Sequence, residues 1–508
     1  MNSPAVRRPW FQSLTAIRLS AVTRTRVAWL VIVAGAVLRV AQYLSGRSLW
    51  LDEAMLALNI IRRPWAGLLV PLDYHQGAPV GYLMLVRTVT TVFGTGEMAL
   101  RLVPVLAGLL ALPLVYWLAQ QLLESNAALL AVGLFAVVDP LIDYSSEAKQ
   151  YSSDVLVALL LLLAAVRFLR FSRPSLLQGL SLGLLGAMAV WFSHPAVFVL
   201  GGVGLTLLWT AAAQRRWSSL APLIITGGLW VASFGAEYMI SLRYLSHDQT
   251  LLLYWQNGFM PIPPLNVSWF LNSFYNMFEY TVGLTAAGVG LGALTFLAGV
   301  VALRQRQGRG LALLLSPLGV TLLASGAHQY PFSGRLLLFA VPAVILIIAA
   351  GAAYLSEVLQ PAPVAAWLLV GLLFLNPLYD ASYHLIHPRT KEEARPVLSY
   401  LRQHWQAGDV IYLQYPSLFA YDYYAPRLGL DNRPVVVGPD SDRWNSLFDD
   451  VDRQRGHPRV WFVFLHIQQP DQTVLVYLSY LDRIGARLDA YRASSSAVYL
   501  YNLAPGAP

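Results

Sequence analysis

Acidic and basic side chains that could carry out acid–base chemistry stand beside long apolar stretches of the sequence. Asp52 and Glu53 follow the first apolar run, and Glu147, Lys149 and Asp154 follow a later one. A charge at a membrane boundary is costly unless it is paired, solvated or used in a reaction. A carboxylate at these positions could accept the proton of a hydroxyl group, and the cations could hold a phosphate. The pattern shows that the charges gather and leaves the reaction itself open.

Two further segments add polar groups between apolar runs. His75 and Gln76 lie between the first two runs, and Tyr330 and Arg335 belong to the stretch Tyr-Pro-Phe-Ser-Gly-Arg. Arginine suits phosphate because its planar guanidinium can donate two hydrogen bonds at once. Trp255 lies in another such segment and is most simply an aromatic residue of the membrane interface.

The composition indicates a membrane protein with many spans. The chain has 508 residues, of which 56% are hydrophobic and only 12% are charged, whereas soluble globular proteins carry about 25% charged residues. The absence of cysteine excludes disulfides, thiolate metal sites and a cysteine nucleophile. The net charge of +8 comes mostly from arginine, which is typical of cytoplasmic loops and does not by itself indicate nucleic-acid binding.

Apolar runs and arginine clusters together predict the topology, because a span needs about 20 apolar residues and cytoplasmic loops collect basic ones. The segment 1–26 contains arginines and no acidic residue, so we expect it in the cytoplasm. The run 79–93 is short and contains Arg87, and we expect it to form a helix on the outer surface. About eleven spans then place every arginine cluster between spans on the inner side. They are 27–45, 99–120, 127–143, 152–170, 176–193, 195–213, 219–243, 280–303, 311–325, 336–353 and 363–380.

The last part of the chain has a different pattern. Residues 381–508 are polar, with strand-like runs at 410–413, 460–465 and 497–501 and helical segments at 391–406 and 473–489. This alternation predicts a small α/β domain, and the number of spans places it outside the cell. The expected organisation is a cytoplasmic segment 1–26, a membrane-spanning α-helical part 27–380 with outer loops 46–98 and 144–151, and an extracytoplasmic α/β domain 381–508.

Four short motifs resemble those of the GT-C membrane glycosyltransferases, in the same order, within residues 27–350. Trp50-Leu-Asp52-Glu53 resembles the first-loop motif, and His-Gln-Gly-Ala-Pro-Val-Gly-Tyr at 75–82 resembles the short helix before the second span. The stretches 147–154 and 330–335 are similar to patterns of bacterial family 39 members. The GT-C group includes protein O-mannosyltransferases and the lipid A aminoarabinose transferase. The latter has an acidic residue and a lysine where His75, Gln76 and Gly77 stand here.

The resemblance implies a catalytic membrane domain that transfers a sugar, with inversion, from a polyprenyl phosphate to an acceptor hydroxyl. It implies that Asp52 is the base and that Glu53 orients the acceptor or the loop. Lys149 and Arg335 would bind the phosphate, and either Glu147 or Asp154 would be the second-loop carboxylate. The other residues expected to bind substrate are His75, Gln76, Tyr82, Tyr151 and Tyr330.

The same resemblance sets the expected partners and place of action. The donor would be a polyprenyl-phosphate sugar, and the acceptor a lipid, a glycan or a protein at the outer face of the cell membrane. No nucleic-acid partner is expected. No cofactor is certain, and a divalent metal is not supported by ligand spacing, because His75, His247 and His328 lie far apart in sequence.

Structural roles and other functions compete with this interpretation. Asp52 could simply cap a helix over 53–61, Lys149 could pair only with a neighbouring carboxylate, and Arg335 could be an interfacial anchor. The alternative function is a transporter or flippase of a polyprenyl-linked or other anionic lipid. A third possibility is a scaffold whose outer domain binds envelope components. Transporters often contain internal repeats, and no repeat is visible in this sequence.

Overall fold

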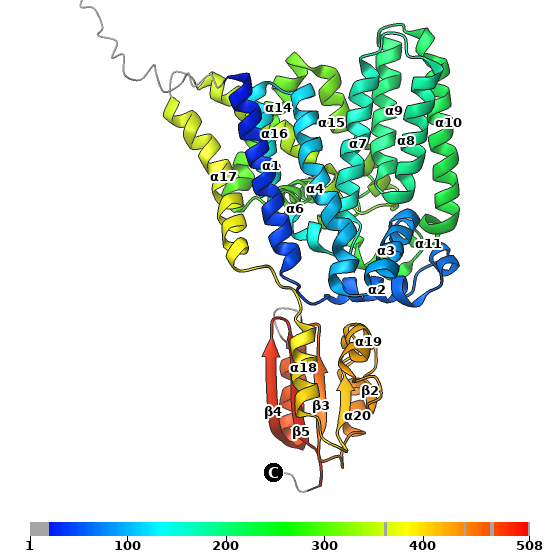
Figure 1. The fold of residues 1–508 in the computed structure, drawn as a ribbon, viewed down its shortest axis with the longest axis vertical. Coiled ribbons are helices and arrows are strands. Elements are labelled where there is room, and N and C mark those ends of the chain that lie inside the picture. Colours follow the sequence, from blue (N-terminus) through cyan, green and yellow to red (C-terminus); the bar gives the residue numbers. More distant parts are fainter. Residues whose placement is uncertain (1–19, 360–362, 441–442, 468–471, 506–508) are drawn as a thin grey trace, which may run out of the picture. The chain divides into compact units, whose positions relative to one another are not determined.

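The computed structural model describes residues 20–359, 363–440, 443–467 and 472–505 (Figure 1). It divides into two compact units. The membrane unit comprises residues 20–44, Gly77–Leu85 and Leu102–His387, and the loop–sheet unit comprises Ser45–Gln76, Val86–Arg101 and residues from 388 onward. Most of the predicted cytoplasmic segment 1–26 lies outside the described residues.

Nine helices in the described residues are long and apolar enough to cross a membrane, or ten if a bent pair counts as one span. This agrees with the expected polytopic helical fold and is close to the eleven spans predicted. The nine are α1 (Ala21–Leu44), α4 (Glu97–Leu122), α7 (Tyr151–Leu169), α9 (Ala196–Ala213), the stretch Trp217–Leu245 around α10 (Leu220–Glu237), α14 (Ala286–Arg306), α15 (Gly308–Gly326), the stretch Gly334–Val358 around α16 (Val341–Val358), and α17 (Pro363–Ile386). The bent pair is α5 (Ser125–Val137) with α6 (Asp139–Asp143).

Two apolar helices fall short of the length of a span. The expected span 176–193 is α8 (Leu176–Phe192), which has 17 residues and packs against α10. The run 79–93, which was not counted as a span, is α3 (Val80–Phe93), with 14 residues. Every predicted span therefore corresponds to a helix, and the difference in number comes from α8 and from the break between α5 and α6.

The break between α5 and α6 is stabilised by a buried arginine. The two helices are inclined by 58°, and Pro140, near the start of α6, cannot donate a backbone hydrogen bond. Arg39 of α1 is 1% exposed and donates to the carbonyl oxygens of Ala136 at 3.1 Å and Phe135 at 3.0 Å. Backbone carbonyls in a membrane interior need a partner within the protein, and the Arg39 guanidinium supplies it.

Helices α14 and α16 approach each other through two glycines. A Cβ atom built at Gly299 would lie 1.9 Å from the carbonyl oxygen of Ile347, and one at Gly351 would lie 1.7 Å from that of Thr295. Small residues at such crossings let helix backbones pack closely in membranes, where lipid gives no hydrophobic drive for association. The membrane-spanning window of Gly334–Val358 is 89% buried, so α16 forms the centre of the membrane unit.

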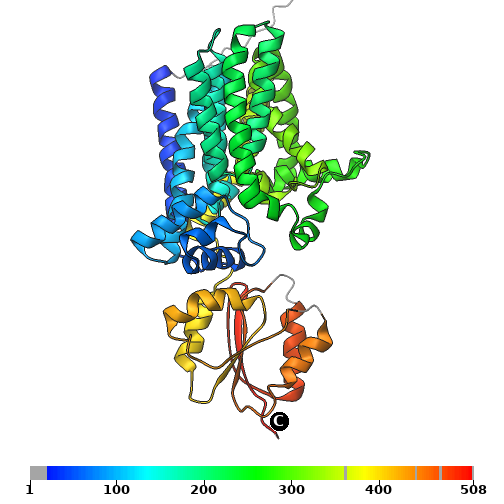
Figure 2. The same ribbon diagram turned by 90° about the vertical axis from the view of Figure 1, so that its right-hand side faces the viewer.

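The loop–sheet unit contains a five-stranded mixed sheet in the order β2-β1-β3-β5-β4. β1 pairs in parallel with β2 and β3, whereas β5 pairs antiparallel with β3 and β4. Figure 2 shows helices on both faces of the sheet, which agrees with the predicted α/β fold. The strands are β1 (Val410–Leu413), β2 (Val435–Val437), β3 (Val460–Phe464), β4 (Ala486–Ala493) and β5 (Ser496–Asn502); the helices are α18 (Ala394–His404), α19 (Ser417–Leu428), α20 (Trp444–Asp452) and α21 (Gln472–Ile484).

One predicted helix in this region is partly wrong. The segment 473–489 was expected to be helical throughout, but α21 ends at Ile484 and residues from Ala486 form β4. Gly485 lies at the change, where a Cβ atom would come within 2.3 Å of the carbonyl oxygen of Asn502. Pairing of β4 with β5 is a tertiary interaction that overrides the local helical preference.

The first loop belongs to the same unit as the sheet. Helix α2 (Leu51–Arg62) packs against α19, and the short 3₁₀ helix η2 (Trp65–Leu69) follows it. Arg87 of α3 donates to the carbonyl oxygens of Ile60 and Ile61 at 2.8 and 2.9 Å. These carbonyls lie at the end of α2, where no helical donor remains, so the arginine closes that end of the helix.

We predict that Gly351→Ala destabilises the membrane unit. The added methyl group would overlap the backbone of α14, and overpacking of this kind costs typically 1–3 kcal/mol. Gly371→Ala in α17 is the matched control, because Gly371 has open space where its Cβ atom would be. The thermal unfolding midpoint in detergent should fall for Gly351→Ala and stay level or rise for Gly371→Ala. Equal midpoints for the two variants would contradict the close packing of α14 on α16.

Candidate functional site

The first carboxylate pair lies in the opening turn of α2. The helix begins at Leu51 and its N-cap residue is Trp50, so Asp52 is inside the first turn rather than at the cap. The idea that Asp52 caps a helix over 53–61 is therefore wrong in its position. A negative charge in the first turn still interacts favourably with the helix dipole. Asp52 is half-buried, whereas Glu53 is fully buried.

Glu53 forms a buried ion pair with Arg101. The two carboxylate oxygens accept from Nε of Arg101 at 2.8 Å and from Nη2 at 2.6 Å, and the two side chains are 0% and 2% exposed. The same guanidinium donates to the carbonyl oxygens of Arg47 at 2.7 Å and Ser48 at 3.0 Å. A bidentate pair with this geometry is strong and directional, so Arg101 fixes both the chain before α2 and its first turn.

Residues after α17 also hold the start of α2. One oxygen of Glu392 accepts from the backbone N–H of Leu51 at 2.9 Å, and the other contacts Nδ1 of His466 at 2.5 Å. The ammonium group of Lys391 lies 4.8 Å from the centre of the Trp50 ring, within the range of a cation–π contact. Burial raises the pKa of Glu392, while His466 and the Leu51 N–H lower it and the charge of Asp52 raises it further. The pKa of Glu392 therefore depends on the charge of Asp52.

His75 and Gln76 follow in the same unit. His75 is exposed and has a φ of 53°, a left-handed backbone conformation that is uncommon for residues other than glycine. Gln76 is buried, and its side-chain amide donates to the carbonyl oxygen of Tyr74 at 3.2 Å. The Tyr74 ring in turn packs edge-on against Phe419 of α19. The turn at 74–76 is thus held in place by packing and by its own hydrogen bonds.

The second-loop residues lie in the membrane unit, directly before α7. Glu147 and Lys149 are 0% and 4% exposed, so the loop carries two buried ionisable groups. Gln150 donates from its side chain to the carbonyl oxygen of Gly77 at 3.2 Å, which joins the loop to the segment that leads into α3. Tyr82, on α3, is also buried. Buried ionisable groups at a membrane boundary are expensive to maintain and are often functional.

Arg335 lies between two aromatic rings. Its guanidinium carbon is 5.7 Å from the centre of the Tyr151 ring and 5.8 Å from that of Trp255. Arg335 belongs to η8 (Gly334–Ala340), and the preceding Gly334 has a positive φ of 49°. Stacking on aromatic faces keeps a guanidinium in place while its N–H groups stay able to reach an anion.

Tyr330 and Asp154 belong to the same neighbourhood. The Tyr330 hydroxyl donates to the carbonyl oxygen of Leu336 at 2.9 Å, and its ring packs edge-on against Phe198. Burial raises the pKa of Tyr330 well above its usual value, and the nearby Asp154 carboxylate and Tyr151 raise it further. Asp154 itself lies in the first turn of α7 and is 4% exposed.

The predicted site residues thus form two groups, one in each compact unit. Asp52, Glu53, His75 and Gln76 lie in the loop–sheet unit. In the membrane unit, contacts join Tyr151 to Arg335 and electrostatic interactions join Tyr330 to Asp154 and Tyr151. The remaining members of the membrane-unit group are Tyr82, Glu147 and Lys149.

Sequence reasoning missed several residues of these groups. Glu392, His466 and Lys391 were not predicted, because they lie far along the chain in a region without a recognised motif. Trp255 was interpreted as an interfacial aromatic, although its ring contacts Arg335. The stretch Lys391-Glu392-Glu393 directly after the last span was the available signal for the first of these contacts.

Within the described residues, no group of three or more His, Cys, Asp or Glu side chains could hold a metal ion. His328 stacks on Phe259, and His247 contacts the carbonyl oxygen of Arg243. The histidines considered as ligands thus have other contacts in the structure.

Comparison with known proteins points to one fold. Residues 77–235 match the model of the dolichyl-phosphate-mannose-protein mannosyltransferase family. No curated protein matches the chain by sequence. Among solved structures, ArnT from Cupriavidus metallidurans in the apo state is 15% identical, with a TM-score of 0.52 over 94% of this chain and 98% of that one. ArnT bound to undecaprenyl phosphate gives 14% identity and a TM-score of 0.52, over 94% and 99% of the two chains.

A second type of protein has the same architecture. The oligosaccharyltransferase of Archaeoglobus fulgidus, in complex with zinc and sulfate, is 13% identical, with a TM-score of 0.51 over 93% of this chain and 73% of that one. The chain therefore has the GT-C fold of membrane glycosyltransferases, and the resemblance found in the four motifs is confirmed at the level of the fold.

We predict that Arg101→Met destabilises the loop–sheet unit by roughly 3–5 kcal/mol, because it leaves the buried Glu53 carboxylate without its cation. Arg62→Met is the control, since Arg62 pairs with Asp422 at an exposed position where a salt bridge contributes about 0–1 kcal/mol. Denaturant unfolding in detergent would measure both. Replacing Glu53 by Leu in the Arg101→Met variant should restore much of the lost stability; no recovery would argue against a stranded charge as the cause.

We also predict a pH-dependent contribution from Glu392. Its pKa is raised from 4.5 in the folded protein, so the folded state binds more protons than the unfolded state between pH 4.5 and the raised value. Its contribution to stability therefore falls as the pH rises through that window and is constant above it. Glu392→Gln removes this titration.

The measurement is the thermal midpoint of wild type and Glu392→Gln across this pH range. The advantage of wild type over the variant should be largest near pH 4.5 and shrink as the pH rises. Glu357→Gln, at a partly exposed pair with Arg306, serves as a control. An advantage that grows with pH would reverse the assigned direction of the Glu392 shift.

Proposed function

We propose that this chain transfers a sugar from a polyprenyl-phosphate donor to an acceptor hydroxyl, with inversion at the anomeric carbon. The acceptor oxygen attacks the anomeric carbon while the bond from that carbon to the phosphate oxygen breaks. Polyprenyl phosphate leaves with the bonding electrons, and a carboxylate takes the proton of the hydroxyl. The GT-C fold supports this class of reaction, and the two groups of site residues supply a base and cations for it.

The observation that carries the assignment of the base is that two adjacent carboxylates have different surroundings. Both oxygens of Glu53 are bound by Arg101 in a buried pair, so Glu53 is poorly suited to accept a proton. Asp52 lies one residue earlier, is half-buried and is not part of that pair. We therefore assign Asp52 as the general base and Glu53 as the residue that positions its turn.

Lys149 and Arg335 are proposed to bind the donor phosphate. Phosphate is a stable leaving group, so cations suffice to stabilise its developing charge without a general acid. The cation–π contacts of Arg335 with Tyr151 and Trp255 support a guanidinium that is held in place at the proposed phosphate site. Trp255 is a further candidate for the wall of the lipid–sugar groove.

Asp154 is the preferred second-loop carboxylate. It lies close enough to Tyr330 and Tyr151 to influence the ionisation of Tyr330, whereas Glu147 is placed earlier in the loop. The proposed role of Asp154 is to orient the sugar or Lys149. His75, Gln76 and Tyr82 are proposed to contact the substrate from the segment before and within α3.

The donor class is supported by a related structure and by the membrane setting. The solved structure of ArnT with undecaprenyl phosphate shows that a protein of this fold binds such a lipid. We propose a polyprenyl-phosphate sugar as donor, and a lipid, glycan or protein as acceptor. The chain is a multi-pass membrane protein, and the arginine pattern supports an N-terminus in the cytoplasm and a C-terminal domain outside.

We predict that Asp52→Asn lowers sugar transfer by about 10²–10⁴-fold, the usual contribution of a general base, without loss of folding. Asp73→Asn is the matched control, because Asp73 is an exposed carboxylate of the same loop that pairs with Arg63. Purified protein would be incubated with defined polyprenyl-phosphate sugars and bacterial membrane extract. Release of polyprenyl phosphate and labelled products would be followed by mass spectrometry.

The same assay also distinguishes the proposed enzyme from a transporter. A transporter would move the lipid without breaking the sugar–phosphate bond, so wild type would release no polyprenyl phosphate with any donor. Normal transfer by a well-folded Asp52→Asn protein would remove Asp52 as the base while leaving the enzyme class intact.

A further inference from the structure

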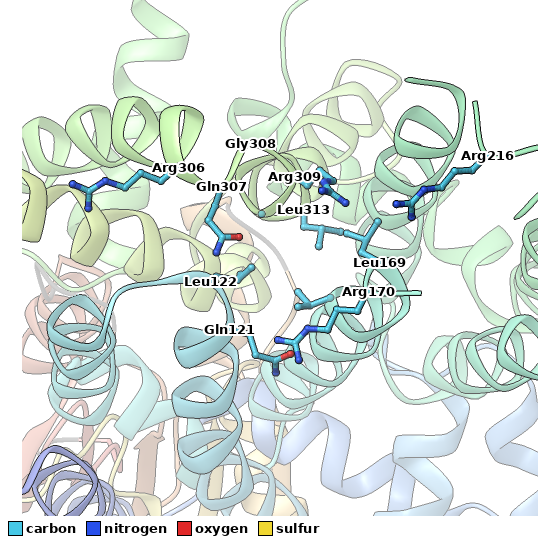
Figure 3. Close-up of a pocket in the computed structure, with 12 residues that line it drawn as sticks. Gln121, Leu122, Leu169, Arg170, Arg216, Arg306, Gln307, Gly308, Arg309 and Leu313 are labelled. Carbon is cyan, nitrogen blue, oxygen red and sulfur yellow. The ribbon is translucent and has the colours of Figure 1, made fainter. Parts of the chain in front are cut away.

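A basic cavity lies at the end of the membrane unit where the arginine clusters gather (Figure 3). Its volume is about 630 Å³, and its walls come from the ends of α4, α7 and α14, the beginning of α15, and the turn before α10. Tyr151 and Asp154 lie near the other end of α7, roughly 28 and 24 Å from Arg170 along the helix axis. The cavity is therefore separate from the site proposed for sugar transfer.

The charged groups around the cavity are all cationic. Arg170, Arg216, Arg306 and Arg309 line it, and none of the described lining residues is acidic. Arg306 is already paired, with Glu124 at 2.5 Å and Glu357 at 2.7 Å. Within the described part of the chain, the side chains of Arg170 and Arg309 donate no hydrogen bond to another residue. Two such guanidiniums beside a concave surface form a positive potential that attracts an anion.

The backbone adds further donors at the same place. Helix α15 begins at Gly308, and the first intrahelical hydrogen bond runs from the N–H of Leu311 to the carbonyl oxygen of Gln307. The N–H groups of residues 308–310 precede that bond and therefore have no acceptor within the helix. Gly308 has open space where a Cβ atom would be. An anion in the cavity could thus approach the positive end of the helix dipole.

A second recess continues from the cavity and is mainly apolar. Its volume is about 420 Å³, and it shares Leu122, Arg306 and Gln307 with the basic cavity. Its other lining residues are Glu124, which pairs with Arg306, and the aliphatic residues Leu123, Ala127, Ala302, Leu303 and Ala350. A soluble anion has no apolar part that could fill such a recess. A phospholipid has both a phosphate for the basic cavity and an acyl chain for the recess.

We infer that this cavity binds the headgroup phosphate of an anionic phospholipid, with part of an acyl chain in the adjoining recess. Arg170 and Arg309 donate to the phosphate, with the N–H groups at the start of α15 nearby. Leu122, which lines both spaces, and the aliphatic residues of the recess hold the first carbons of the chain. This site is independent of the proposed sugar transfer and would hold a lipid of the membrane leaflet at the arginine-rich end.

The test uses full-length protein in detergent and counts bound lipids by native mass spectrometry. Phosphatidylglycerol and phosphatidylcholine are added in separate samples. Inorganic phosphate is then added to the sample that contains phosphatidylglycerol. The test variant is Arg170→Gln/Arg309→Gln. The control variant is Arg167→Gln/Arg304→Gln, which removes the same charge from exposed positions at the ends of α7 and α14 that do not line the cavity.

Wild type and the control are expected to bind phosphatidylglycerol with similar affinity and in preference to phosphatidylcholine. The test variant should bind phosphatidylglycerol roughly thirtyfold more weakly, since each basic residue contributes about 1 kcal/mol to anionic-lipid binding. Equal losses in the two variants would overturn the inference in favour of general charge attraction. Displacement of the lipid by millimolar inorganic phosphate would overturn it in favour of a soluble anion.

Discussion

Moving a carboxylate and a guanidinium out of water costs several kcal/mol for each ion, and only close, fully hydrogen-bonded geometry offsets that cost. Glu53 and Arg101 meet this condition, because the guanidinium binds both carboxylate oxygens and two backbone carbonyls as well. The first turn of α2 therefore has one stable orientation within the loop–sheet unit. Asp52 lies on that turn, so the direction of its carboxylate depends on a neighbour that, in our proposal, takes no part in proton transfer. The contact of Glu392 with the N–H of Leu51 supports the same turn from the sheet side.

The two groups of site residues use charge in different ways. In the loop–sheet unit, acidic groups are held by ion pairs and backbone donors, which fixes their positions. In the membrane unit, the guanidinium of Arg335 contacts the faces of Tyr151 and Trp255, which are neutral rings. The first arrangement holds the turn that carries the proposed base, and the second suits a cation that is proposed to receive a charged ligand. The proposed roles of the two groups thus differ because their side chains have different partners.

The sequence predicted the features that depend on local pattern and failed where distant segments meet. Each predicted span corresponds to a helix because an apolar run of sufficient length has few alternatives in a membrane. Residues 486–489 were assigned to a helix because their pairing with β5 cannot be read locally. Arg101 and its partner Glu53 lie 48 positions apart, so their pairing could not be identified from either segment alone. The contact of Glu392 with Leu51 joins segments 341 positions apart, and His466 binds the same carboxylate from a third segment, so the sequence around each residue does not identify its partner.

The close crossing of α14 and α16 has a consequence for how a long lipid could reach the interior. The spanning window that contains α16 is 89% buried, whereas those of Trp217–Leu245 and of α17 are 22% and 17% buried. A helix whose backbone touches its neighbour through glycine cannot shift without losing that contact. We therefore expect the α14–α16 pair to stay in place. The windows of Trp217–Leu245 and α17 are mostly unburied, and the turn at Tyr238–Leu242 is a wider π-helical coil of a kind often found at functional sites. We therefore expect a long lipid to enter sideways from the bilayer past the helix that carries this turn, without movement of the α14–α16 pair.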